Sequence, residues 1–448
     1  MSPVSSPTSL PRTTGLRQVF RALNNRNYRL FFFGQGVSLI GTWMQTIALG
    51  WLVYRMTHSP FLLGMVGFAG QLPLLLLTPL AGVLSDRWPR RPVLVVTQSL
   101  AMLQALTLAC LTLTGFVQVW HLMVLAVFSG AINSFDMPTR QAFTLEMVGR
   151  KEDLPNAIAL NSSLFNASRL IGPTIAGILI SIVGEGACFL LNGLSYIAAI
   201  VALLSMRLAP PQTRVSEKDI LKDLQIGVRY AFGFLPIRNI LLLLAVVSLV
   251  GMPYTVLMPV FAKDVLHGGA QTLGILMAAT GVGALVGTIY LAARNSVVGL
   301  GKRIPLAAAC FGVGLIGFSF SRHMLFSLPL IAIAGFGMMV SMASSNTILQ
   351  TIAEEDKRGR LMSLYAMAFA GVAPFGSLLA GTLSTRIGAP ATITLGGFVC
   401  LVGAGLFALQ LPQLRALVRP IYSEKGILPA VASGLSAASE VASATREG

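Results

Sequence analysis

The sequence predicts an all-α membrane protein with twelve transmembrane helices in two six-helix halves and with both termini in the cytoplasm. Of its 448 residues, 54 % are hydrophobic and only 11 % are charged. A soluble domain carries about 25 % charged residues. Twelve apolar runs divide the chain, and a helix needs about 20 apolar residues to cross a bilayer. The runs cover residues 30–54, 61–84, 93–115, 120–139, 157–183, 186–206, 239–262, 272–293, 304–321, 324–350, 361–385 and 390–411.

Positive charge alternates between the connections of these runs. The N-terminal arm and every second connection after it hold 27 of the 32 Lys and Arg residues. Four lie on the other side, at Arg55, Lys263, Arg322 and Arg386, and Arg169 lies inside a run. Because short loops rich in Lys and Arg stay in the cytoplasm, both termini are expected there. The net charge of +16 is thus explained by topology and by contact with the lipid bilayer, and no nucleic acid is expected as a partner.

One basic connection, between the second and third runs, combines a single acid with three arginines. It reads Gly82-Val83-Leu84-Ser85-Asp86-Arg87-Trp88-Pro89-Arg90-Arg91 and is expected to form a tight loop. This pattern, G-x-x-x-D-R-x-x-R-R, resembles the loop between helices 2 and 3 of the major facilitator superfamily, with Pro89 where that family usually has glycine. The resemblance implies the major facilitator fold.

In that family the loop is a cytoplasmic gate, whose acid and arginine pair with neighbouring helices. The resemblance therefore implies a contact between Arg90 and Asp136, at the cytoplasmic end of the fourth run. The alternative is that the charges only anchor the loop in the cytoplasm. The gate residues expected on this basis are Gly82, Asp86, Arg87, Arg90, Arg91, Asp136 and Arg140.

Three further segments narrow the resemblance. Residues 133–143, 152–161 and 169–177 are similar, in sequence and order, to the enterobactin-exporter-like (transmembrane secretion effector) branch of the superfamily. Gly172, Pro173 and Gly177 resemble the fifth-helix motif of superfamily antiporters and exporters. The family implies export of small organic molecules, commonly driven by proton antiport.

Polar side chains recur at helical spacing in three of the runs. They are Ser162, Asn166, Arg169 and Pro173 in the fifth run, Gln35, Ser38, Thr42 and Gln45 in the first, and Asn346 and Gln350 in the tenth. We expect these faces to line a central substrate cavity. The alternative is hydrogen bonding between helices that holds the bundle together.

Arg169 lies about twelve residues into the fifth run, which is about 18 Å along a helix that rises 1.5 Å per residue. A charge at this depth is costly, and no acid lies at a similar depth, so we expect a water-filled cavity around it. A guanidinium offers a planar fork of donors that suits carboxylate or phenolate oxygens. The substrate is therefore expected to be anionic or oxygen-rich, such as a siderophore-like molecule, rather than a lipophilic cation.

Few groups are available to couple transport to energy. No glycine-rich phosphate loop with a lysine supports the use of ATP, and no nucleophile–base set indicates an enzyme. The acids that the spans offer are Asp136, near the cytoplasmic face, and Glu185, at the outer end, of which Asp136 is the better candidate for the proton carrier, unless the substrate itself carries the charge. The cysteines and histidines show no metal-ligand spacing, so no metal, cofactor or disulfide is expected.

The expected organisation has five parts. A cytoplasmic N-terminal arm (1–29), without a cleavable signal peptide, precedes the first half (30–207). A cytoplasmic linker (208–238) holds an amphipathic helix that begins at a capping box of Ser216 and Asp219, although a plain solvated linker is the alternative. The second half (239–411) is followed by an Ala/Ser-rich cytoplasmic tail (412–448).

Together these features predict a secondary transporter in a bacterial cytoplasmic membrane, which is expected to be a monomer and to export a small amphiphilic molecule by alternating access. Proton coupling is expected. Import, or flipping of a lysolipid, is the alternative within the same fold. A membrane sensor or scaffold without transport is the alternative of another class, but polar stripes and a buried arginine favour a hydrated path.

Overall fold

The computed structural model describes residues 20–208, 220–294 and 296–427, without the side chains of residues 79, 82–87, 151 and 220–224. This part of the chain is helical and contains no strand. Twelve of its helices are long and apolar enough to cross a membrane, which confirms the predicted number of spans.

The six spans of the first half are single helices. They are α2 (Arg26–Thr57), α3 (Pro60–Arg87), α4 (Arg90–Leu113), α5 (Val119–Val148), α6 (Leu154–Val183) and α7 (Glu185–Leu204). Two short 3-10 helices, η1 (Arg21–Asn24) and η2 (Lys151–Asp153), precede α2 and α6. The Asn25 side chain caps α2 by accepting hydrogen bonds from the backbone N–H groups of Asn27 and Tyr28.

Two of the six spans in the second half are composite. The first consists of α9 (Leu235–Val246), η3 (Val247–Gly251), α10 (Tyr254–Val260) and η4 (Phe261–Val265), and the fifth of α14 (Arg358–Ala366), η5 (Met367–Gly371) and α15 (Ala373–Ile387). The others are α11 (Ala270–Ala292), α12 (Leu300–Phe320), α13 (Met324–Ile352) and α16 (Ala389–Glu424).

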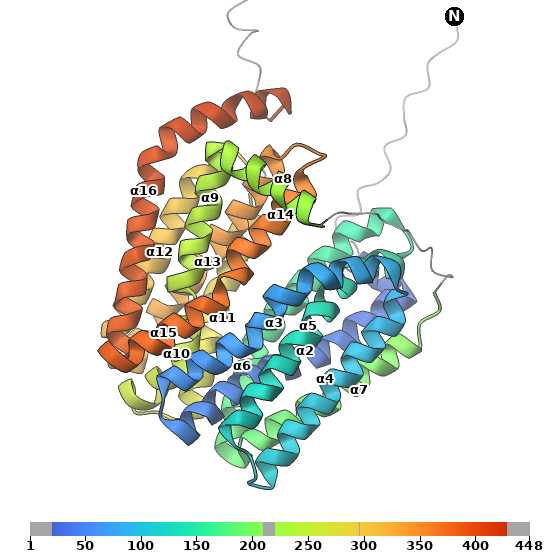
Figure 1. The fold of residues 1–448 in the computed structure, drawn as a ribbon, viewed down its shortest axis with the longest axis vertical. Coiled ribbons are helices and arrows are strands. Elements are labelled where there is room, and N and C mark those ends of the chain that lie inside the picture. Colours follow the sequence, from blue (N-terminus) through green and yellow to red (C-terminus); the bar gives the residue numbers. More distant parts are fainter. Residues whose placement is uncertain (1–19, 209–219, 295, 428–448) are drawn as a thin grey trace, which may run out of the picture.

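The two halves form bundles that meet on one side and diverge on the other (Figure 1). Their connections fall on two faces. We call the basic face the one with residues 88–89, residues 149–153 and the C-terminal end of α16. The opposite face carries the sharp turns at Gly184 and Gly388, whose φ angles of 85° and 84° favour glycine. These two turns join the fifth and sixth spans of each half, which makes the halves similar in construction.

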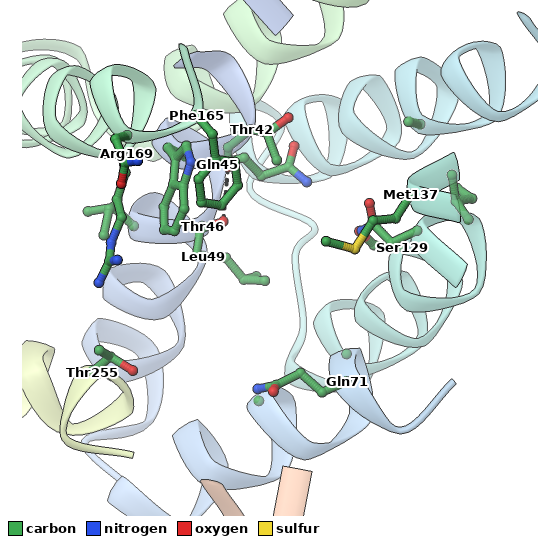
Figure 2. Close-up of a pocket in the computed structure, with 18 of the residues that line it drawn as sticks. Thr42, Gln45, Thr46, Leu49, Gln71, Ser129, Met137, Phe165, Arg169 and Thr255 are labelled. Atoms are coloured by element: carbon green, nitrogen blue, oxygen red, sulfur yellow. Dashed lines mark hydrogen bonds between the residues drawn. The ribbon is translucent and has the colours of Figure 1, made fainter. Parts of the chain in front are cut away.

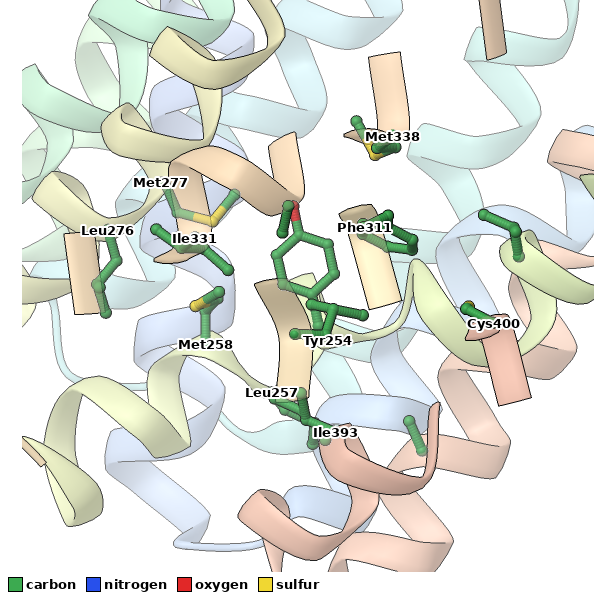
Figure 3. Packing of buried hydrophobic residues seen from close by; sticks show 14 of the residues in the cluster. Tyr254, Leu257, Met258, Leu276, Met277, Phe311, Ile331, Met338, Ile393 and Cys400 are labelled. Carbon is green, nitrogen blue, oxygen red and sulfur yellow. The ribbon is translucent and has the colours of Figure 1, made fainter. Parts of the chain in front are cut away.

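The interruptions of the composite spans are π-helical turns next to prolines. Pro253 follows η3 and Pro374 follows η5, and proline removes a backbone hydrogen bond from the helix. The turn after η3 directs Tyr254 into the core of the second half, where its ring meets Phe311 edge-on at 6.0 Å between centroids (Figure 3). Because π turns are frequent at functional sites, these spans are candidates for contact with a ligand.

Three expected boundaries are wrong because charged side chains did not end the helices. The fourth span continues from residue 139 to Val148, and α16 continues past residue 411 to Glu424. The loop expected at residues 82–91 shrinks to Trp88 and Pro89, since α3 includes Arg87 and α4 begins at Arg90. A helix that projects beyond the membrane can carry charges in its last turns.

The helix expected between the halves is present as α8 (Ile220–Gly233), while its expected capping residues Ser216 and Asp219 lie outside the described residues. On the basic face, the Lys357 ammonium lies 4.8 Å from the centroid of the Tyr230 ring of α8. The hydrogen bond that Lys357 Nζ donates to Glu354 Oε2 raises the pKa of this ammonium. Residues 1–19 and 428–448, which hold most of the expected arm and tail, also lie outside the description.

Candidate functional site

A cavity of about 1380 Å³ lies between the two halves. Its walls come from α2 to α7 on one side and mainly from α10, α11, α13 and η5 on the other. Along the first half, the lining runs from Leu63, near the opposite face, to Arg90 and Leu154 at the basic face. The cavity therefore reaches the basic face.

Close contacts between glycines seal the halves together at the opposite face. A Cβ atom on Gly64 of α3 would lie 2.5 Å from the carbonyl oxygen of Ser377 and 3.0 Å from Cα of Gly381 in α15. A Cβ atom on Gly274 of α11 would lie 2.6 Å from the carbonyl oxygen of Pro173 in α6. Small residues let helix backbones approach this closely. The cavity is consequently open to the basic face and closed to the opposite one.

Two polar contacts accompany this closure. The hydroxyl of Tyr54 in α2 donates a hydrogen bond to Asp264 Oδ2 in η4, which joins one half to the other. One residue further on, Arg55 Nε and Nη2 donate to Glu185 at 2.7 Å and 3.1 Å, which ties α2 to the start of α7. The first contact crosses between the halves, and the second stays within one of them.

The wall from the first half is polar, and a buried amide network holds part of it in place. Gln45 Nε2 donates to Gln104 Oε1 at 2.9 Å, and Gln45 Oε1 accepts from Asn192 Nδ2 at 2.8 Å. These three side chains are buried and lie on α2, α4 and α7. Polar residues of this wall are Thr42, Gln45, Thr46, Gln71, Gln104, Ser129, Asn133, Gln141, Thr144, Asn161, Ser162, Asn166, Arg169 and Tyr196.

Arg169 is half-buried in this polar wall (Figure 2). Its guanidinium carbon lies 5.9 Å from the centroid of the Trp43 ring, and Trp43 meets Phe165 edge-on at 5.7 Å between centroids. Stacking on an indole stabilises a cation. Among the described residues, no acidic side chain forms an ion pair with Arg169. Its charge is thus oriented by aromatic rings and left available to the cavity.

The wall from the second half is apolar and rich in methionine. It includes Met252, Val256, Pro259, Leu273, Met277, Met338, Met339, Met342 and Phe369, with Thr255 as a polar exception. Methionine side chains are flexible and polarizable, so they adapt to ligands of different shape. Arg90 and Arg169 are the charged residues among the described lining, and no acid is among them. The cavity therefore offers hydrogen bonds and positive charge on one wall and an apolar surface on the other.

The expected substrate residues divide between this cavity and other places. The cavity is lined by five of them, namely Thr42, Gln45, Ser162, Asn166 and Arg169. Gln35 and Ser38 do not, because the first half of α2 packs against α6 and α7 and buries both side chains. Their expected place in the cavity wall is corrected accordingly.

Asn346 and Gln350 also lie outside the cavity wall, which corrects the expectation for α13. The lining of α13 ends at Met342, one turn before Asn346, and Gln350 Nε2 donates to Asn346 Oδ1 instead. The fifth-helix motif residues are packing residues in this structure. Gly172 faces Trp43, Pro173 is buried, and Gly177 meets α11 near Gly274.

The expected gate residues form a different set of contacts from the one anticipated. Asp136 is only 2 % exposed, and it pairs with Arg140, one turn later on α5. It also accepts hydrogen bonds from Thr97 Oγ1 at 2.9 Å and Gln98 Nε2 at 2.8 Å. The expected contact between Arg90 and Asp136 is wrong, because Arg140 occupies that position.

Arg90 instead pairs with Glu146, and Arg91 Nη2 donates to the carbonyl oxygen of Leu204 at 2.6 Å. These two arginines therefore tie the start of α4 to α5 and α7. The side chains of Gly82, Asp86 and Arg87 lie outside the described residues, although their backbone forms the end of α3.

Two acids that sequence reasoning did not single out take part in these contacts. Glu146 lies beyond the predicted end of the fourth run at residue 139, and Asp264 lies beyond the predicted end of the seventh run at residue 262. The sequence signal for both acids is that the helical pattern continues past the predicted end of each run. Glu146 lies nine residues after Met137, near the end of α5, where it reaches Arg90, and Asp264 lies in the last turn of its span.

Residues 18–426 match the family of transmembrane secretion effectors. The chain belongs to this family. The family is a branch of the major facilitator superfamily, so both resemblances drawn from the sequence are confirmed. This secretion effector is a multi-pass membrane transporter and not an enzyme.

Curated relatives of this secretion effector are transporters of similar length. The staphyloferrin A transporter of Staphylococcus aureus is 26 % identical over 82 % of this chain and 92 % of its own. The multidrug efflux pump Tap of Mycolicibacterium fortuitum is 28 % identical over 87 % and 96 %. The enterobactin exporter EntS of Shigella boydii is 25 % identical over 87 % and 92 %.

Solved structures share the fold of this secretion effector. A bacterial homologue of the human lysosomal transporter Spinster, in an inward-facing and unoccupied conformation, has a TM-score of 0.64 at 13 % identity, with 90 % of this chain and 98 % of that one covered. A POT family transporter in complex with 5-aminolevulinic acid has a TM-score of 0.67 at 13 % identity, with 87 % and 97 % covered. At this identity the likeness concerns the fold alone.

Proposed function

We propose that this secretion effector exports an amphiphilic, anionic or oxygen-rich small molecule across a bacterial cytoplasmic membrane by alternating access. The observation that carries the proposal is Arg169, a cation in the polar wall of the central cavity that pairs with no acid among the residues described. An anionic oxygen of the substrate supplies the missing partner. The fork of a guanidinium binds a carboxylate or a catecholate through two parallel hydrogen bonds.

The opposite wall supports an amphiphilic substrate. Its methionines face the polar wall across the cavity and give an apolar part of the substrate a surface that adapts to its shape. The relatives support the same class, since their names assign them staphyloferrin A, enterobactin and multiple drugs. We infer a substrate with an oxygen-rich end directed toward Arg169 and an apolar body against the methionines.

The direction of transport rests on the distribution of charge. Short connections rich in Lys and Arg remain in the cytoplasm, so the basic face is assigned to the cytoplasm. The cavity then opens inward, and the substrate enters from the cytoplasm. Closure of the basic face and opening of the opposite face complete the cycle. In this scheme one region rearranges when the cytoplasmic side closes. It contains the expected gate residues Gly82, Asp86, Arg87, Arg90, Arg91, Asp136 and Arg140.

Coupling to a proton gradient is assigned to the pair of Asp136 and Arg140. Asp136 is a buried carboxylate within a span, and such groups carry protons in transporters. Protonation of Asp136 removes the charge that Arg140 neutralises and frees the arginine to take another partner. The pair thus offers a switch near the basic face that responds to protons.

The test is transport in inside-out membrane vesicles over a panel of catecholates, carboxylates and lipophilic cations, with and without a proton gradient. Uptake of anionic compounds that depends on the gradient, and its loss in Asp136→Asn, is expected. The matched control is Arg386→Gln, an exposed charge on the opposite face. Selective movement of cations contradicts the substrate class, transport in the reverse sense indicates an importer, and movement of lysolipid alone indicates a flippase. No transport of any compound by folded protein favours a sensor or scaffold.

A further inference from the structure

A second cavity, of about 400 Å³, lies apart from the substrate cavity, between α9, α12 and the C-terminal part of α16. Its floor is apolar and includes Ile240, Phe407 and Leu411. Three basic side chains, Lys302, Arg415 and Arg419, line it from α12 and α16. The cavity therefore combines an apolar surface with positive charge, so it is amphiphilic.

The three cations have no counter-charge within the described part of the chain. All three are exposed, and among the described residues no side chain or carbonyl group forms a hydrogen bond or an ion pair with them. No acidic residue is part of the described lining. Like charges gathered around one cavity repel each other and attract an anion. An anion at this position balances a charge that the described residues leave unbalanced.

The position of the cavity relates it to the membrane surface. α16 has 36 residues, or about 54 Å at 1.5 Å per residue, whereas the apolar core of a bilayer is about 30 Å thick. In Figure 1, α16 rises along the second half and then bends over the basic face. Lys425 fixes this end, since its Nζ donates to the carbonyl oxygens of Thr351 and Ala353 at 2.7 Å and 3.1 Å.

The basic residues of α16 consequently lie in the part of the helix that passes the end of the apolar core, and Phe407 and Leu411 lie deeper. This order, with apolar residues toward the membrane centre and arginines toward the surface, matches the order of acyl chains and phosphate in a lipid. Basic cavities between transmembrane helices on the cytoplasmic side suit anionic lipid headgroups.

We propose that this cavity binds an anionic phospholipid of the leaflet at the basic face. The phosphate lies among Lys302, Arg415 and Arg419, and the first part of an acyl chain covers Ile240, Phe407 and Leu411. This site is separate from the substrate cavity and does not depend on which molecule is transported.

The test is native mass spectrometry of the purified full-length protein with equimolar phosphatidylglycerol and phosphatidylcholine of identical acyl chains. The wild type is expected to retain phosphatidylglycerol preferentially. The double variant Arg415→Gln/Arg419→Gln is expected to bind it about 30-fold more weakly, from the contribution of two basic residues at a membrane surface. The control Arg229→Gln/Arg358→Gln removes two exposed charges from the basic face outside the cavity and is expected to leave binding unchanged.

A third variant separates the cavity from its charge. A Cβ atom on Gly301, which lines the cavity in α12, would lie 3.8 Å from Leu411 Cδ1, so Gly301→Leu fills the space and keeps every charge. It is expected to lose the retained lipid as well. The proposal is overturned if both cavity variants bind like the wild type, or if the control pair loses binding equally. It is also overturned if phosphatidylcholine competes equally, or if inorganic phosphate or glycerol phosphate at the same concentration displaces the lipid.

Discussion

The hydroxyl of Tyr54 in α2 donates a hydrogen bond to the carboxylate of Asp264 in η4, and this contact links the two halves at the face where the cavity is closed. Tyr54 is 2 % exposed, whereas Asp264 is exposed. A hydrogen bond of this kind stabilises the closed arrangement only while the halves are together. In the proposed alternating-access cycle, this contact breaks each time the opposite face opens.

Tyr54→Phe is expected to weaken closure at the opposite face. Loss of one hydrogen bond costs about 1 kcal/mol, which shifts an equilibrium between two conformations about fivefold. The shift is measured by electron–electron resonance between spin labels at Phe116 and Leu325, exposed residues of different halves near the opposite face. Tyr290→Phe, on the exposed side of α11, is the control. An unchanged distance distribution in Tyr54→Phe excludes a role for this contact in closure.

Gly64→Ala is expected to hinder closure through contact of backbones. The added methyl group would lie 2.5 Å from the Ser377 carbonyl oxygen, so α3 and α15 must separate. Overpacking of this kind costs about 1–3 kcal/mol. Longer distances between the same spin labels and slower transport are expected. Gly405→Ala is the control, because nothing lies within 4 Å of a Cβ atom there. Equal behaviour of the two variants would argue against a tight seal at Gly64.

The pairing of Asp136 is tested by two double-mutant cycles that measure stability by thermal unfolding. Removing one partner of a buried ion pair costs about 3–5 kcal/mol because the other charge is left unpaired. The effects of Asp136→Asn and Arg140→Gln on stability are therefore expected to be non-additive. The double variant should lose less stability than the sum of the losses in the two single variants. Asp136→Asn and Arg90→Gln are expected to be additive, since Arg90 pairs with Glu146. The reverse result would restore the pairing of Arg90 with Asp136.

The fold was predictable because its physical causes lie within single segments. The length of each apolar run and the sign of each connection determine the spans, and a lone arginine in such a run requires a polar environment. Arg169 thus lies in the cavity wall, as its depth suggested. The polar face of α2 was predicted only in part. Thr42 and Gln45 line the cavity but Gln35 and Ser38 do not, because a polar face in the sequence does not reveal whether a neighbouring helix or water covers it.

The contacts between charges were less predictable because they depend on where helices end. Asp136 and Arg140 are one turn apart only if α5 continues past residue 139, and Asp264 reaches Tyr54 only at the seam of two halves. Neither condition is encoded in local hydropathy. The methionine wall shows the same limit, since its residues come from four separate elements that only the packing of the second half brings together.

The central claim is that Arg169 binds the anionic end of the substrate. The most direct measurement is the initial rate of export from proteoliposomes for a catecholate or carboxylate substrate and for its neutral ester, in the wild type, Arg169→Lys and Arg169→Ala. Hydrogen bonds to charged groups contribute about 1.5–3 kcal/mol, so Arg169→Ala is expected to slow export of the acid about 10- to 150-fold and to leave the ester nearly unchanged. Arg169→Lys, which keeps the charge and loses the fork, is expected to fall between them. An acid-to-ester ratio in Arg169→Ala equal to that of the wild type would contradict the account.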